Sequence, residues 1–71
     1  MKKTYLEKLK AVLERDDFDG LDQVLEEAIL GELTEDEVNE LDEILNEATL
    51  YAEFKESEYK ERALELINIL I

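Results

Sequence analysis

Carboxylates are the side chains in this sequence with the greatest capacity for chemistry. The 71 residues include 21 aspartates and glutamates against eight lysines and arginines, which gives a formal net charge of −13. Four of the acids follow one another at spacings of four, three and four, which places them on one face of a helix, away from the apolar stripe. They are Asp36, Glu40, Glu43 and Glu47. We interpret this acidic row as a surface that binds a positively charged protein.

The acidic row has a second explanation, because acidic surfaces also keep small proteins in solution. Like charges one turn apart destabilise a helix by about 0.2–0.5 kcal/mol per pair. A helix selected for stability alone usually alternates glutamate with lysine, and this sequence does not. Partner binding and solubility therefore both stay open as explanations at the level of the sequence.

The negative charge is concentrated in the middle of the chain. Residues 16–54 contain fifteen acids and no base, while all eight basic residues lie outside this central acidic segment. A basic protein surface is the expected partner, and one such surface is the groove of a nucleic-acid-binding protein. Carboxylates there would take the place of phosphates, so the chain could act as a nucleic-acid mimic and inhibitor. Direct binding to nucleic acid is not expected, because phosphates would be repelled.

One segment partly matches the EF-hand calcium loop. With Gly20 at the invariant sixth position, Asp17, Asp19 and Glu26 fall at positions three, five and twelve. Arg15 occupies position one, where a cation cannot coordinate another cation. We therefore expect an acidic turn with a helix cap, and neither a metal site nor a cofactor.

Catalysis is not expected either. The sequence has no cysteine and no histidine, which excludes thiolate nucleophiles and imidazole acid–base steps. A carboxyl group acts as a general acid only when a dry pocket raises its pKa, and a chain this short has little room for one. The sequence favours a non-enzymatic interaction protein.

Helix signals dominate the chain, which lacks proline. Thr4 with Glu7 and Thr34 with Glu37 each form a capping-box pattern at a helix start, and Gly31 is suited to end a helix. We predict an all-α fold in one domain, 1–71, built as a small bundle of three or four helices. Their approximate ranges are 4–15, 20–30, 35–54 and 57–71. A break between the last two is favoured, and one continuous helix stays open as the alternative.

The C-terminal segment carries more apolar residues than one buried stripe requires. Ala63, Leu66, Ile67 and Leu70 can fill the core stripe. Leu64, Ile69 and Ile71 point elsewhere on the helix and predict self-association. We expect a homodimer, since two-fold pairing is the commonest way to bury such a patch; a monomer whose other helices cover the patch and a higher oligomer are the alternatives. The second functional interpretation is thus a self-associating structural or adaptor module, in which the charge serves solubility only.

The aromatic residues and the compartment complete these expectations. Phe18, in a predicted turn, is expected to close one end of the bundle, and the hydroxyls of Tyr5, Tyr51 and Tyr59 are expected to face water.

No apolar run in the sequence approaches the ~18 residues of a membrane span. The two lysines at the start of the chain are followed by charged residues where a signal peptide has its apolar region. We expect a cytoplasmic protein without membrane contact. The composition suits a phage or mobile-element product or a small bacterial regulator.

Overall fold

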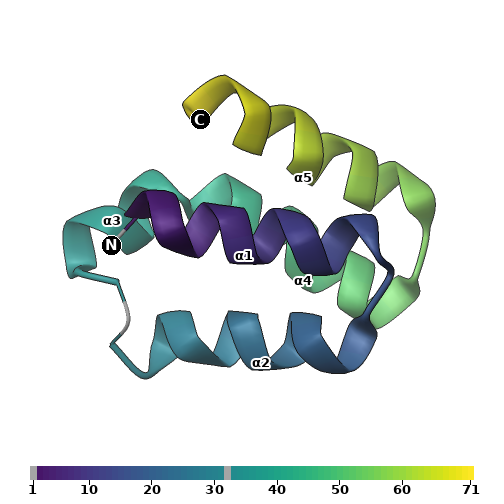
Figure 1. Cartoon of the computed structure of the whole chain (residues 1–71), viewed down its shortest axis with the longest axis horizontal. Helices are drawn as coiled ribbons and strands as arrows, with labels where there is room; N and C mark the ends of the chain where they lie inside the picture. The colour runs from purple at the N-terminus through teal and green to yellow at the C-terminus, as the bar shows by residue number, and fades with distance from the viewer. Residues whose placement is uncertain (1, 32) are drawn as a thin grey trace.

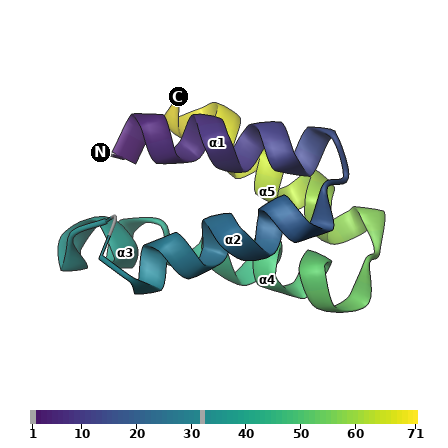
Figure 2. The same cartoon turned by 60° about the horizontal axis from the view of Figure 1, so that its bottom comes forward.

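The described residues form five helices and no strand, which confirms the all-α prediction. The computed structural model describes residues 2–31 and 33–71. The helices are α1 (Lys2–Glu14), α2 (Phe18–Ile29), α3 (Glu35–Glu40), α4 (Asp42–Phe54) and α5 (Ser57–Leu70). The four longer helices pack in the cyclic order α1, α2, α4, α5, and the short α3 lies at the end where α1 begins and α5 finishes (Figures 1 and 2).

The predicted helix over 35–54 is wrong, because it is interrupted at Leu41. Leu41 has φ −96° and ψ 9°, and its N–H bonds to the carbonyl of Glu37. α3 buries none of its residues, whereas Leu41 itself is fully buried. The interruption places Leu41 in the core, with α3 on one side of it and α4 on the other. This raises the helix count to five, above the predicted three or four.

The favoured break after Phe54 is confirmed. Lys55 ends α4 in the left-handed conformation, with φ 58°, and donates its backbone N–H to the carbonyl of Tyr51. Glu56 is extended, and α5 starts at Ser57. The chain therefore reverses within two residues, which lets α5 run back along α4 (Figure 1).

The predicted start is correct for α3 and displaced for α1 and α2. Thr34 and Glu37 form the expected reciprocal capping box before α3. By contrast, α1 already begins at Lys2, so Thr4 lies inside the helix instead of capping it. α2 begins at Phe18, two residues earlier than predicted, because the Asp17 side chain accepts a hydrogen bond from the backbone N–H of Gly20. Gly31 is left-handed as expected, with φ +102°.

The core is one cluster to which α1, α2, α4 and α5 all contribute. Phe18 packs against it with its ring centroid 5.2 Å from that of Tyr51, as expected for a residue that closes the bundle end. The expectation of solvated tyrosine hydroxyls is wrong for two of the three. Tyr5 is buried and donates its hydroxyl to the carbonyl of Val24 at 2.7 Å, and Tyr51 is also buried. In the described chain, no helix combines the length and the apolar character that crossing a membrane requires.

Candidate protein-binding groove

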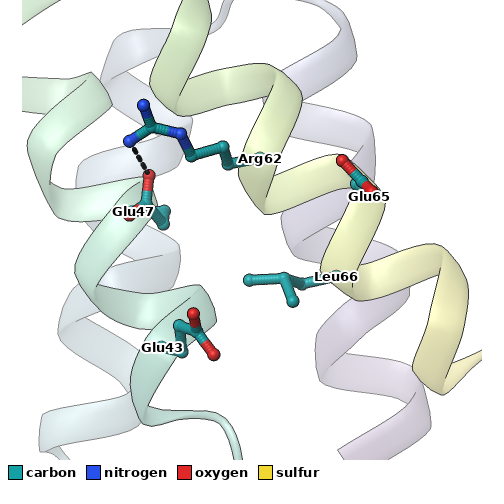
Figure 3. Close-up of a pocket in the computed structure, with 5 residues that line it drawn as sticks. All are labelled: Glu43, Glu47, Arg62, Glu65 and Leu66. Carbon is teal, nitrogen blue, oxygen red and sulfur yellow. Dashed lines mark ion pairs between the residues drawn. The ribbon is translucent and has the colours of Figure 1, made fainter.

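A groove lies between α4 and α5, and it is the candidate functional site. It consists of two adjoining hollows of about 170 and 190 Å³ that share Glu43 and Leu66. The first is lined by Glu43, Glu47, Arg62, Glu65 and Leu66. The second is lined by Glu40, Glu43, Ile44, Leu66, Ile69 and Leu70. Figure 3 shows α4 and α5 diverging from Arg62 toward Leu66, with the Leu66 side chain between them. We call this feature the α4–α5 groove.

The helical period explains which side chains border the groove. Ala48 on α4 and Ala63 and Ile67 on α5 are fully buried. The residues that immediately precede these buried positions lie at the edge of the interface. Glu47 precedes Ala48, and Leu66 precedes Ile67. Residues one turn away from these two, such as Glu43 and Arg62, continue the two edges.

Negative charge dominates the edges of the groove. Arg62 pairs with Glu47 at 3.5 Å and with Glu58 on its own helix at 2.6 Å. Glu43 and Glu65 form no ion pair with any residue that the structure describes. Glu47 is largely buried, and its Oε2 atom accepts no hydrogen bond from the described residues. One guanidinium is therefore surrounded by carboxylates with spare capacity to accept hydrogen bonds.

The acidic row is divided by the interruption at Leu41. Asp36 and Glu40 lie on α3, while Glu43 and Glu47 lie on α4. Glu40, Glu43 and Glu47 line the groove, whereas Asp36 is exposed outside it. Lys2 pairs with Glu40 at 2.6 Å. Sequence reasoning missed this cation and Arg62, because both approach the row only through the tertiary fold.

The residues predicted for self-association are separated as well. Leu64 is half-buried and packs against the core. Ile69 and Ile71 remain 72% and 51% exposed. The expectation that Leu70 fills the core is wrong, since this side chain is 40% exposed. α5 buries Ala63 and Ile67 only, so its last turn extends past the core and brings Ile69 and Leu70 to the same groove as the acids.

A polar cluster at the opposite end of the bundle was also missed by sequence reasoning. The Tyr51 hydroxyl donates to Oδ1 of Asp16, and the Lys60 ammonium contacts the same oxygen at 2.8 Å. The hydrogen bonds from Lys60 and then from Tyr51 lower the pKa of Asp16. The hydrogen bond to Asp16, followed by burial, raises the pKa of Tyr51 to about 12. The cluster joins the end of α1 to α4 and α5, so we assign it a structural role.

This cluster predicts a dependence of stability on pH at both extremes. The stability that Asp16 contributes is complete above its usual pKa of about 3.9 and is lost as the pH falls through the lowered value. The contribution of Tyr51 is complete below its usual pKa of about 10 and is lost as the pH rises toward 12. We expect Tyr51→Phe to remove tyrosinate absorbance that develops near pH 12 in an alkaline titration. Loss of absorbance that develops near pH 10 instead would contradict the hydrogen bond to Asp16.

The segment that partly matches a calcium loop does not form one. α2 begins at Phe18, so Asp19 and Glu26 lie within a helix, and Asp17 caps it. No group of three or more acidic residues within the described ranges is arranged to hold a metal ion. Each hollow of the α4–α5 groove is also smaller than the ~300–1,000 Å³ of typical small-molecule sites. The groove is therefore better suited to a protein segment than to a small ligand.

Comparison of the chain with known protein families, with curated proteins and with solved structures found no match.

Proposed function

We propose that this chain is a non-enzymatic interaction protein whose central acidic segment, residues 16–54, binds a basic protein surface. The supporting observation is the charge that remains after folding. Among the residues that the structure describes, ion pairs engage four acids of this segment: Asp16, Glu27, Glu40 and Glu47. Nine others form no ion pair with a described residue: Asp17, Asp19, Asp22, Glu26, Glu35, Asp36, Asp42, Glu43 and Glu53.

A basic partner would relieve the repulsion among these carboxylates. The complementary charges would speed association and make it sensitive to salt, because salt screens exposed charges over about 10 Å at 0.1 M. The proposed partner is a basic protein surface. In the more specific form of the proposal the partner is a nucleic-acid-binding protein, and the carboxylates mimic phosphates. We place this function in the cytoplasm, with no direct contact to nucleic acid or membrane.

Two double variants with the same net charge test the proposal. Asp36→Asn with Glu43→Gln removes two unpaired charges from the central segment, while Glu14→Gln with Glu61→Gln removes two exposed charges outside it. The partner is first captured from a lysate at low salt, identified and purified. We expect the central variant to weaken its binding about tenfold, as loss of ~1.4 kcal/mol requires, and the control to bind like the original chain.

The salt dependence and a competition assay complete this test. Affinity for the partner is expected to fall steeply with ionic strength. If duplex DNA displaces the chain from the partner, the mimicry form of the proposal is supported. Equal loss of affinity in both double variants would show that only total charge matters and would contradict a role for the central segment.

The second candidate function, self-association as a structural or adaptor module, is favoured by the exposure of Ile69 and Ile71. Salt does not weaken an apolar contact of this kind, and it screens the repulsion between two copies of net charge −13. Self-association that persists or strengthens at high salt would therefore favour this candidate over the acidic surface.

A further inference from the structure

We propose that the α4–α5 groove binds a basic amphipathic helix, which is the part of the partner that this chain recognises. The inference rests on the proposed function and specifies the partner's recognition element. Two features of the groove together define its occupant: an apolar floor and negatively charged edges.

The floor of the groove is apolar and open to solvent at the end of α5. Leu66 and Ile44 lie between the helices, and Ile69 and Leu70 extend the apolar surface along the last turn. Ile69 is 72% exposed, although burying such a side chain is favourable. A partner that covers this surface would gain the hydrophobic energy that the fold leaves unused.

The edges of the groove select a cationic partner. Glu43 stands on the α4 side and Glu65 on the α5 side (Figure 3), and neither pairs with a described residue. An amphipathic helix docks by placing its apolar stripe on the floor of such a groove. Lysine or arginine residues on both flanks of that stripe would then reach the two carboxylates. The groove therefore complements a helix in apolar surface and in charge at once.

The length of the groove fits a short helical segment. It follows α5 from Arg62 to Leu70, which at 1.5 Å per residue is about 12 Å, or roughly two helical turns. Apolar residues at positions i, i+3, i+4 and i+7 of the partner would span this distance. A second copy of this chain fits less well, because two copies of net charge −13 repel each other.

A designed peptide provides the test. It carries leucines at i, i+3, i+4 and i+7, lysines on both flanks and a single tryptophan at its end. Because the chain itself has no tryptophan, the fluorescence of the peptide reports binding without background. The matched control peptide has the same composition, with its leucines scattered around the helix. We expect the amphipathic peptide to bind the full chain about tenfold more tightly than the control, as desolvation of a central apolar anchor implies.

Paired variants of the chain locate the binding surface. Ile69→Lys lies in the groove, and Ile29→Lys changes an isoleucine at the end of α2 that is 85% exposed, compared with 72% for Ile69. Glu43→Lys lies at the edge of the groove, and Glu53→Lys changes an exposed glutamate elsewhere on α4. We expect each groove variant to weaken binding of the amphipathic peptide about tenfold and each control about twofold or less. Circular dichroism is used to check that all four variants remain helical.

The outcomes separate this inference from the proposed function. Equal, salt-sensitive binding of both peptides would overturn the groove and leave a binding role for acidic charge intact. Binding of the amphipathic peptide that is unaffected by salt and by Glu43→Lys would overturn the charged edges of the groove. If neither peptide binds, the groove proposal is wrong, and the double variants with the captured partner decide the proposed function separately. If sedimentation at tens of micromolar shows a dimer that Ile69→Lys dissociates, the occupant is a second copy and the proposed helix is wrong.

Discussion

Replacement of Leu41 with alanine is expected to lower the free energy of unfolding by about 2–5 kcal/mol, the usual cost of truncating a fully buried leucine. Leu41 has no exposed surface and lies at the junction of α3 and α4. A domain of this length has a total stability of only about 4–11 kcal/mol, at about 0.05–0.15 kcal/mol per residue. The variant is therefore expected to be largely destabilised and partly unfolded at physiological temperature.

Urea unfolding followed by circular dichroism measures this effect. Leu30→Ala is the matched control, because the same side chain is truncated where it is 76% exposed. Its free energy of unfolding is expected to change by about 0.5 kcal/mol or less. Comparable losses in the two variants would show that Leu41 is not held in the core.

The helix boundaries show which parts of the fold are determined by residues close together in the sequence. Thr34 and Gly31 are in the predicted positions because a capping side chain and a left-handed glycine act within a few residues of themselves. The interruption at Leu41 has no such local signal. Sharp breaks in helices usually occur at proline or glycine, and neither residue type lies close to Leu41 in the sequence. The interruption coincides with a fully buried residue, and which residues are buried depends on the other helices.

The candidate site also has some features that the sequence predicts and others that depend on the tertiary fold. The spacing of Glu43 and Glu47 placed both residues on one helix face, and the structure agrees. The cations that approach the row could not be predicted, because Lys2 and Arg62 come from α1 and α5. Helix periodicity gives the face of each helix, whereas ion pairs between helices require the packing order.

The two functional interpretations of the sequence meet at one place in the structure. Sequence reasoning treated the acidic row and the apolar C-terminal segment as rival sites. The packing of α5 against α4 brings Ile69 beside Glu40 and Glu43 in one groove. A charged edge and an apolar floor are then parts of a single surface, so a partner that uses one is expected to contact the other.

Enlargement of Ala63 tests the packing on which this surface depends. Ala63 on α5 and Ala48 on α4 have no exposed surface, and their small side chains allow the core to close where the two helices pack. Ala63→Leu adds three carbon atoms to a filled space and is expected to lower the free energy of unfolding by about 1–3 kcal/mol. Urea unfolding measures the loss, and Ala11→Leu is the control on the exposed face of α1.

The same substitution also links packing to binding. A leucine at position 63 would push α5 away from α4 near Arg62 and would alter the width of the groove without changing any residue that lines it. We expect Ala63→Leu to weaken binding of the amphipathic peptide even at low temperature, where circular dichroism shows the variant to be folded, and Ala11→Leu to leave it unchanged. If Ala63→Leu is as stable as Ala11→Leu, the space around Ala63 can accommodate a larger side chain. The shape of the groove would then not depend on the close approach of α4 and α5.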